Sequence, residues 1–375
     1  MRFPLRALRT GALRKLPLSF VACLAFASAP LQLLLVGCGS DDSATEASVP
    51  SNGADAALTD GATHPTSDAG LSDAAPTSDA GAFCGLRNGK RGLSSRTLSA
   101  AGLTRTYLVY LPATADPSKP LPLVFVFHGY LMSGQEMHDI TQYTTLADSE
   151  GVALAFPDGQ GGADAVGSPW NVENSGQTVC GNVQSFVATG DDFAFMDAMK
   201  ADIGEDQCLD SAHEFATGFS MGGYFSHHVG CYRDDIRAIA PHSGGTLADL
   251  SACTTGHVPV ILFHGTADTT IPPGCDDPNS AAQPGFPASA KLWAAKNGCA
   301  TTTTKVTENG TGGGLGQCYV YDGCPADGQV ELCTFTGMAH CWAGGSSSGQ
   351  GAAFGCPTWA NATQLEWSFF KKYAW

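Results

Sequence analysis

Apolar and polar residues follow recognisable patterns from about residue 100 to the end of the chain. Residues 121–129, LPLVFVFHG, form a continuous apolar run that ends in glycine, as a strand covered on both faces does. Residues 103–112 instead alternate apolar and polar positions, which predicts an early antiparallel strand. Similar short runs predict further strands at residues 152–159, 213–220, 236–244, 258–268 and 330–337.

Between these runs the apolar residues recur at helical spacing, as they do within residues 191–206. Residues 133–151 are predicted as one helix with Ser133 as its N-cap and Gly151 at its end. Further helices are predicted at residues 221–232, 288–298 and 362–375. Strands that alternate with helices predict an α/β fold with a mostly parallel central sheet and helices on both faces. Ligands then bind at the carboxyl ends of the strands.

The N-terminal residues have a different pattern. Residues 1–37 combine a basic start, an apolar run and small residues, which predicts an export signal. A transmembrane anchor is disfavoured because Pro30 and Gln32 interrupt the run. The letters LVGC at residues 35–38 resemble the lipobox of bacterial lipoproteins, which implies a signal peptide over 1–37 and lipidation of Cys38. We therefore expect an extracytoplasmic protein, lipid-anchored on a bacterial membrane or cell surface, with plain secretion as the alternative.

Residues 38–82 are rich in Ala, Ser and Asp and lack aromatic residues, Lys and Arg, so we expect a disordered tether. The remainder, residues 83–375, suits one large domain. The formal net charge of the chain is −16, which argues against nucleic acid and anionic membrane surfaces as partners. Contact with a membrane is expected only through the lipid anchor, and the domain is expected to be a monomer.

Cysteine usage agrees with export. Of 14 cysteines, Cys23 lies in the predicted signal and Cys38 in the lipobox, which leaves an even number in the domain. Outside the cytosol these are expected to form disulfides, up to six of them. The alternative is a metal site, because four cysteines lie close together, but their spacings lack a Cys-x-x-Cys pair: Cys318, Cys324, Cys333 and Cys341. We therefore expect no metal.

The pattern Gly-x-Ser-x-Gly occurs twice in this glycine-rich chain, at residues 218–222 and 345–349. The first copy lies where the predicted strand 213–220 meets the predicted helix 221–232, as a nucleophile turn requires. The glycines on either side of Ser220 leave room for so tight a turn. The second copy, GSSSG, lies in a predicted loop and is rejected. Ser220 is therefore the candidate nucleophile.

A serine nucleophile needs a base, and the base needs an acid that orients it, in the chain order Ser, acid, His for this architecture. Asp268 is the acid that directly follows an apolar strand; the reserves are Asp249, Asp276 and Asp277. His340 follows the last predicted strand, where the base belongs. The other histidines after Ser220 are expected to have structural roles: His227, His228, His242 and His264.

Acyl transfer also needs donors for the oxyanion. The backbone N–H of Met221, the residue after the nucleophile, is the first candidate. The N–H of Tyr130, in the loop after strand 121–129, is the second. His128 in this loop is expected to be structural rather than a second base.

Seven motifs along residues 84–375 together resemble one family: LVFVFHGY, FPDGQG followed by WN (170–171), DDFAFMDAMKADI, ATGFSMGGYFSHHVGC, APHSGG, ILFHGTADTTIPP and GMAHCW. They look like the feruloyl-esterase and polyhydroxybutyrate-depolymerase-like group of α/β-hydrolases, which is similar to carbohydrate esterase family 1. The resemblance implies a serine esterase without metal or organic cofactor and carries over Ser220, Asp268 and His340.

Relatives often end the last motif in GxHxWPG, whereas this chain has Ala343 at the proline position and Cys341 beside the base. We expect a disulfide at Cys341 to fix the His340 loop. Substrate contacts are expected at Trp170, Asn171 and Trp342, with burial in the core as the alternative for the tryptophans.

The resulting hypothesis is a carboxylic ester hydrolase that acts on feruloyl or acetyl esters of plant polysaccharide. The alternative substrate is a polyhydroxybutyrate oligomer. An alternative of another class is a non-catalytic carbohydrate-binding surface protein on a hydrolase fold. A peptidase on this fold is disfavoured because no N-terminal gating domain is evident.

Overall fold

The computed structural model describes residues 84–160, 169–172, 188, 190–246, 250–272, 288–306, 316–356 and 360–374. The chain divides into two units, Met1–Asp73 and Ala74–Trp375, and every described residue belongs to the second. The predicted signal peptide, Cys38 and the tether therefore lie outside the described residues. So do the reserve acids, Asp249, Asp276 and Asp277.

Among the described residues, one ten-stranded sheet organises the domain, in the order β1-β2-β4-β3-β5-β6-β7-β10-β9-β8. Its middle, from β4 to β10, is parallel, and antiparallel strands extend both edges. The strands are β1 (Gly92–Ala100), β2 (Leu103–Leu111), β3 (Leu121–Phe127), β4 (Ala153–Pro157), β5 (Leu209–Phe219), β6 (Ile236–His242), β7 (Val260–Gly265), β8 (Thr303–Val306), β9 (Gly316–Tyr321) and β10 (Val330–Phe335). The predicted α/β class with a mostly parallel sheet is confirmed.

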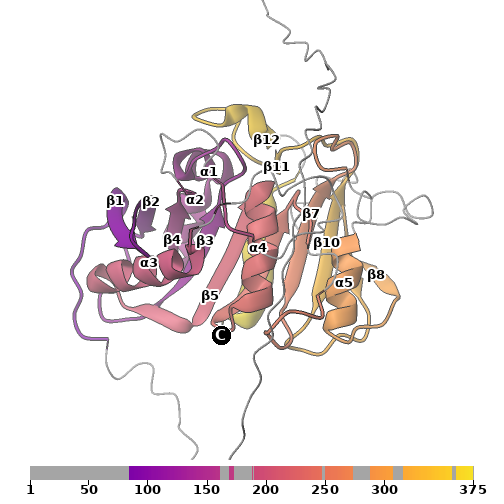
Figure 1. Cartoon of the computed structure of the whole chain (residues 1–375), viewed down its shortest axis with the longest axis horizontal. Coiled ribbons are helices and arrows are strands. Elements are labelled where there is room, and N and C mark those ends of the chain that lie inside the picture. The colour runs from indigo at the N-terminus through magenta and orange to yellow at the C-terminus, as the bar shows by residue number, and fades with distance from the viewer. Residues whose placement is uncertain are drawn as a thin grey trace, which may run out of the picture. The chain divides into compact units, whose positions relative to one another are not determined.

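Helices cover both faces of this sheet (Figure 1). Each face has its own apolar core. One face packs against α3 (Asp192–Asp206), α4 (Met221–Tyr232) and α5 (Ala288–Lys296). The other packs against α1 (Gly134–Thr141), α2 (Tyr143–Glu150) and α6 (Ala362–Phe370). The continuous apolar strands are thereby buried on both sides: every residue of β3, β4 and β7 is buried.

The helix predicted at residues 133–151 is two helices. Ser133 caps the first through its side chain and Gly151 ends the second, as expected. Gln142 lies between them with a φ of 53°, in the left-handed region. The carbonyl of Thr141 accepts a hydrogen bond from the hydroxyl of Thr363 instead of continuing the helix. This contact spans 222 residues of sequence, so local periodicity did not reveal it.

Five of the described strands are absent from the predicted pattern. Strand β1 pairs with β2 at one edge of the sheet; its buried positions are Ser94 and Ala100, and its exposed positions include Leu93. Strands β8 and β9 extend the opposite edge. The last two, β11 (Trp342–Ala343) and β12 (Gly355–Cys356), pair over two residues beside the 3-10 helix η3 (Ala352–Phe354). The closing helix ends at Phe370 and continues as the 3-10 helix η4 (Lys371–Tyr373).

Within the described residues, five disulfides join ten cysteines, and the expected disulfide at Cys341 is among them. The pairs are Cys84–Cys208, Cys231–Cys253, Cys299–Cys324, Cys318–Cys333 and Cys341–Cys356. The four cysteines weighed as metal ligands thus belong to three different disulfides. Cys180 and Cys275 lie outside the described residues. In the part of the chain that is described, no helix is long and apolar enough to cross a membrane.

Candidate active site

Ser220 lies at the turn between β5 and α4, at the carboxyl edge of the sheet. Its φ of 56° and ψ of −116° are a backbone conformation that residues other than glycine rarely adopt. Its N–H donates to the carbonyl oxygen of His242 on β6, 2.9 Å away, which fixes the turn. The side chain is half-buried, and its hydroxyl has no hydrogen-bond partner within the described ranges. The turn therefore presents the hydroxyl at the N-terminus of α4.

Three glycines let the backbone pass close to Ser220. A Cβ atom on Gly218 would lie 2.4 Å from the carbonyl oxygen of Gly222, and one on Gly222 would lie 2.2 Å from the carbonyl oxygen of Phe127. A Cβ atom on Gly129 would lie 3.2 Å from Cβ of Ser220. The first two obstacles are main-chain atoms, which side-chain rotation does not relieve. The spacing Gly-x-Ser-x-Gly therefore follows from the crossing of β3, β5 and α4.

Asp268 and His340 meet at the same edge of the sheet. Asp268 follows β7, and its Oδ2 atom lies 2.7 Å from Nδ1 of His340. The other oxygen, Oδ1, accepts the N–H groups of Thr270 and Ile271, each at 2.9 Å. Asp268 is 3% exposed. These contacts hold the carboxylate in one orientation toward the imidazole.

Burial acts to raise the pKa of Asp268, but the hydrogen bond and charge of His340 and the Ile271 N–H outweigh it, so the pKa lies below its usual value. His264 also helps, since its Nε2 atom lies 3.6 Å from Oδ2 of Asp268. His264 itself is buried, and its Nε2 atom bonds the Ile271 carbonyl at 2.7 Å. The carboxylate is thus ionised at neutral pH.

The His340 ring lies against Phe219, the residue before Ser220, with 4.7 Å between the ring centroids. His340 remains partly accessible, with its side chain 11% exposed. The structure therefore brings the three predicted residues to one edge: Ser220 after β5, Asp268 after β7 and His340 after β10. Nδ1 of His340 is hydrogen-bonded to Asp268, so Nε2 is the ring nitrogen that can accept a proton.

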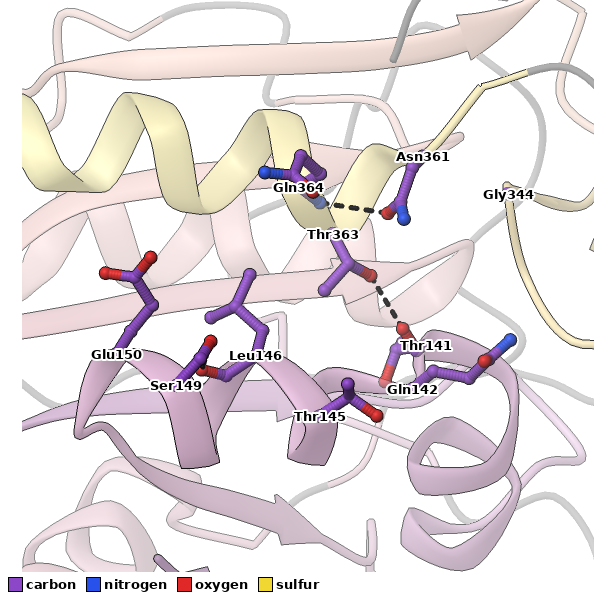
Figure 2. A pocket seen from close by; sticks show the side chains of 10 residues that line it. All are labelled: Thr141, Gln142, Thr145, Leu146, Ser149, Glu150, Gly344, Asn361, Thr363 and Gln364. Atoms are coloured by element: carbon purple, nitrogen blue, oxygen red, sulfur yellow. Dashed lines mark hydrogen bonds between the residues drawn. The ribbon is translucent and has the colours of Figure 1, made fainter. Parts of the chain in front are cut away.

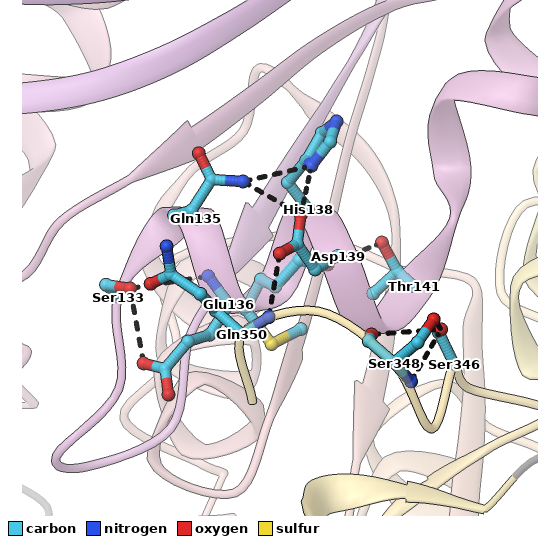
Figure 3. A network of polar contacts seen from close by, with 10 residues as sticks. Ser133, Gln135, Glu136, His138, Asp139, Thr141, Ser346, Ser348 and Gln350 are labelled. Atoms are coloured by element: carbon cyan, nitrogen blue, oxygen red, sulfur yellow. Dashed lines mark hydrogen bonds and ion pairs between the residues drawn. The ribbon is translucent and has the colours of Figure 1, made fainter. Parts of the chain in front are cut away.

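The loop after His340 is fastened to α1. Asp139 accepts the Gln350 N–H at 2.9 Å through Oδ2, while its Oδ1 atom accepts from the amide of Gln135 at 2.8 Å (Figure 3). The Ser346 N–H donates to the Ile140 carbonyl at 2.9 Å. The second Gly-x-Ser-x-Gly copy, residues 345–349, lies in this loop outside any strand or helix. It therefore lacks the strand-to-helix turn that a serine nucleophile requires.

A pocket of about 270 Å³ lies between α1, α2, Gly344 and the start of α6 (Figure 2). None of the three predicted catalytic residues lines it. The hydroxyl of Thr363 on its wall donates to the Thr141 carbonyl at 2.8 Å and accepts the indole N–H of Trp342 at 3.2 Å. The pocket wall therefore anchors the His340 loop and is separate from the reacting groups.

The loop after β3 carries the second predicted oxyanion donor, Tyr130, and His128 holds this loop in place. His128 is fully buried; its Nδ1–H donates to the Gly129 carbonyl at 2.7 Å and its Nε2 accepts the Gly159 N–H at 2.8 Å. Burial lowers the pKa of His128 to about 4, so the ring is neutral. These contacts agree with a structural role for His128 in the loop whose Gly129 lies against Ser220.

Two of the three predicted substrate contacts are in the core. Trp170 is 1% exposed; its N–H donates to the His128 carbonyl at 2.8 Å and its ring stacks on Phe225. Trp342 is 0% exposed and stacks on His242. Neither indole presents a face to a substrate in this conformation. Asn171 is half-buried, and its side-chain amide donates to the Gly190 carbonyl at 2.9 Å.

The histidines set aside as bases are all buried. Burial lowers the pKa of His227 to about 3 and that of His228 to about 4. His227 accepts the indole N–H of Trp293 at 2.9 Å, on the α5 side of the sheet. The sequence predicts a structural role for His242, but it did not predict its contacts with both the turn at Ser220 (the serine turn) and the loop after His340 (the His340 loop). The sequence signal for it was only its place at the end of an apolar strand.

Comparisons with known proteins give a consistent set of relatives. Feruloyl esterase C of Emericella nidulans is 30% identical over 214 residues, which are 56% of this chain and 68% of that protein. Feruloyl esterase D of Neurospora crassa is 28% identical over 57% of this chain and 74% of its own length. Feruloyl esterase B of Piromyces equi is 29% identical over 63% of this chain, which spans less than half of that protein, 42%.

Among solved structures, an acetyl xylan esterase from Aspergillus awamori is similar with a TM-score of 0.48 and 16% identity, over 66% of this chain and 94% of that one. No family model matches the chain. The aligned length and identity with the Emericella nidulans protein decide the classification. This chain belongs to the feruloyl esterase family of carboxylic ester hydrolases.

Proposed function

We propose that the domain is a serine esterase in which Ser220 is the nucleophile, His340 the general base and Asp268 the residue that orients the base. The 2.7 Å contact between Nδ1 of His340 and the buried Asp268 carries this proposal. A carboxylate on Nδ1 fixes the tautomer with a proton there and leaves Nε2 free to accept the serine proton. The ring of His340 lies beside that of Phe219, the residue before Ser220, which supports this role.

In the proposed reaction, His340 takes the proton of Ser220 as its oxygen attacks the ester carbonyl. The alcohol leaves with a proton returned by His340, and water repeats these steps on the acyl-enzyme. Asp268 stabilises the imidazolium that forms in each half-reaction. Among the described residues the hydroxyl of Ser220 has no hydrogen-bond partner, and catalytic hydrogen bonds commonly tighten only in the substrate complex.

The negative oxygen that develops on the substrate carbonyl would be bound by the main-chain N–H groups of Met221 and Tyr130. Met221 is the first residue of α4, so its N–H lies at the positive end of that helix. The loop that carries Tyr130 passes beside Ser220, because a Cβ atom on Gly129 would lie 3.2 Å from Cβ of Ser220. No metal or cofactor is needed for this chemistry.

The substrates that we propose are feruloyl or acetyl esters attached to plant polysaccharide. The names of the relatives support an aromatic or acetyl ester, and the net charge of −16 is compatible with a neutral polysaccharide. A polyhydroxybutyrate oligomer remains the second candidate from the sequence. The five disulfides favour an oxidising compartment, so we propose that the enzyme works outside the cytoplasm, anchored through Cys38.

The function is tested by comparing the wild type with Ser220→Ala on p-nitrophenyl acetate, methyl ferulate, acetylated xylan and hydroxybutyrate oligomers. We expect hydrolysis of the ferulate or acetyl esters by the wild type and none by the variant. A fluorophosphonate should label the wild type at Ser220 alone. Equal activity of the two proteins would exclude Ser220 as nucleophile, and a folded wild type that hydrolyses no ester and takes no label would indicate a binding protein.

A further inference from the structure

His242 contacts all three segments that carry the proposed catalytic residues. Its carbonyl oxygen accepts the N–H of Ser220 at 2.9 Å, and its ring nitrogen Nε2 accepts the N–H of Ala343, in the His340 loop, at 3.2 Å. Its ring also stacks on Phe263 of β7, the strand that leads to Asp268, with centroids 5.6 Å apart. One buried residue thus joins the serine turn, the aspartate strand and the histidine loop.

The hydrogen bonds of His242 define its tautomer. Because Nε2 accepts from Ala343, the ring proton lies on Nδ1, where it donates to the hydroxyl of Ser243 at 3.1 Å. Both ring nitrogens are therefore satisfied. The pKa of His242 is held well below its usual value, first by burial and then by the nearby His264 and His340, so the acceptor at Nε2 is kept.

The imidazole lies between aromatic rings. Trp342 stacks on the imidazole with ring centroids 4.7 Å apart and ring planes 20° apart. Both residues are 0% exposed. Trp342 is two residues after His340, and Ala343, whose N–H His242 accepts, is itself 0% exposed. A buried N–H without an acceptor is costly, so the loop has one favourable position relative to the ring.

We propose that His242 is a positioning residue for the reaction, which sets the His340 loop relative to Ser220 through its Nε2 acceptor and its stacked ring. The inference rests on the proposed function, since it assigns His242 a part in the rate of the Ser220 reaction. It goes beyond a core-packing role, because it predicts that the acceptor atom at Nε2 matters for turnover even when the fold is intact.

Three substitutions separate the atoms of the ring. His242→Gln places an amide oxygen near the Nε2 position, His242→Asn places one near the Nδ1 position, and His242→Phe keeps the stacked ring without an acceptor. His227→Phe is the matched control, since His227 is a buried histidine that also accepts an N–H and stacks on a tryptophan, Trp293 of α5. It lies in the second half of α4, and none of its printed contacts is with the Asp268 strand or the His340 loop.

The measurement is kcat and KM for p-nitrophenyl acetate. Fluorophosphonate labelling gives the number of intact sites, and kcat is expressed per labelled site so that unfolded protein is excluded. We expect kcat per site to fall about 10- to 100-fold in His242→Phe and His242→Asn with KM nearly unchanged, to recover to within about threefold in His242→Gln, and to stay at the wild-type value in His227→Phe.

The inference is overturned if His242→Phe keeps the wild-type kcat per site, or if His242→Gln and His242→Phe lose activity equally. Failure of the proposed function looks different, because Ser220→Ala would then retain activity or the wild type would have none. If His242→Phe yields no folded protein, the comparison of His242→Gln with His242→Asn decides: equal kcat per site in these two overturns the inference, and a faster His242→Gln supports it.

Discussion

The imidazole of His340 and the carboxylate of Asp268 are 72 residues apart in sequence and 2.7 Å apart in the structure. We predict that Asp268→Asn, which keeps the size of the side chain, lowers kcat about 10⁴-fold, because the amide favours the tautomer with the proton on the wrong nitrogen. The measurement is hydrolysis of p-nitrophenyl acetate at neutral pH.

A surface pair supplies the control for this substitution. His257 and Asp327 lie 3.1 Å apart with both side chains exposed. Asp327→Asn makes the same chemical change in a His–Asp pair and is expected to leave kcat unchanged, since exposed pairs of this kind contribute little. If Asp268→Asn were as active as Asp327→Asn, Asp268 would have no part in catalysis.

The tight turn at Ser220 predicts a steep cost at Gly222. In Gly222→Ala the new methyl group would lie 2.2 Å from the Phe127 carbonyl oxygen and 2.7 Å from that of His128. We expect a loss of stability of about 1–3 kcal/mol or more and a loss of esterase activity, because β3 and α4 must separate. Thermal unfolding and activity of the purified variant measure both effects.

Gly204 in α3 is the matched position, since a Cβ atom there meets nothing within 4 Å. Gly204→Ala is expected to stabilise the protein by about 0.5–1 kcal/mol with unchanged activity. Similar behaviour of the two variants would contradict the role of close backbone packing at the serine turn.

Two disulfides of equal span allow the His340 loop to be tested. Cys341–Cys356 and Cys318–Cys333 each join residues 15 apart in sequence, so their chain-entropy contributions are the same, about 3 kcal/mol. We predict that replacing either pair by serine lowers the free energy of unfolding similarly. Only the loss of Cys341–Cys356 should also lower kcat per folded site, because it releases the loop that carries His340.

The readouts are denaturant unfolding and fluorophosphonate-normalised kinetics of the two double variants. Equal kcat per site in both would mean that the contacts of the loop with α1, such as Asp139 with Gln350, suffice to hold His340. A larger loss of kcat without Cys318–Cys333 would place the sensitive contact in β9 and β10 instead.

The sequence was informative wherever a local constraint has a strong signature. The glycines around Ser220 are required because main-chain segments cross there. The apolar strand before Asp268 ends at the carboxyl edge of the sheet and so places Asp268 at that edge. Pattern and chain order therefore identified residues that the fold brings together. Long-range contacts were not visible. The bond between Thr363 and Thr141 ends a helix from 222 residues away, and burial of Trp170 and Trp342 depends on which neighbours fold onto them.

The same limit explains the edges of the sheet and His242. Strands β1, β8 and β9 are less completely buried than the central strands and lack their continuous apolar runs. The pattern predicts His242 at the end of a strand, but its acceptor role depends on Ala343, 101 residues later, whose N–H meets Nε2. Pairings between distant segments are set by the sheet order, which the residue pattern does not encode.

Glu366 on α6 gives a prediction for pH dependence. It is 0% exposed, and its oxygens lie 3.0 Å from the hydroxyls of Tyr143 and Thr217, the latter three residues before Ser220. The Thr217 hydroxyl also donates to the Ala240 carbonyl at 2.7 Å, so one proton cannot serve both acceptors. A protonated Glu366 resolves this by donating to Thr217, and burial raises its pKa well above the usual value.

The native state therefore keeps the Glu366 proton, whereas the unfolded chain releases it above a pKa of about 4.3. Between this pKa and the higher pKa of the folded state, the free energy of unfolding falls by about 1.4 kcal/mol for each unit of rising pH. Glu366→Gln mimics the protonated acid, with its amide N–H donating to Thr217. We predict that the variant gains stability relative to the wild type between pH 5 and pH 8. Glu150→Gln on the surface, beside Lys371, should show no such gain. Denaturant unfolding at both pH values measures the difference, and a constant difference would mean that Glu366 is ionised in the native core.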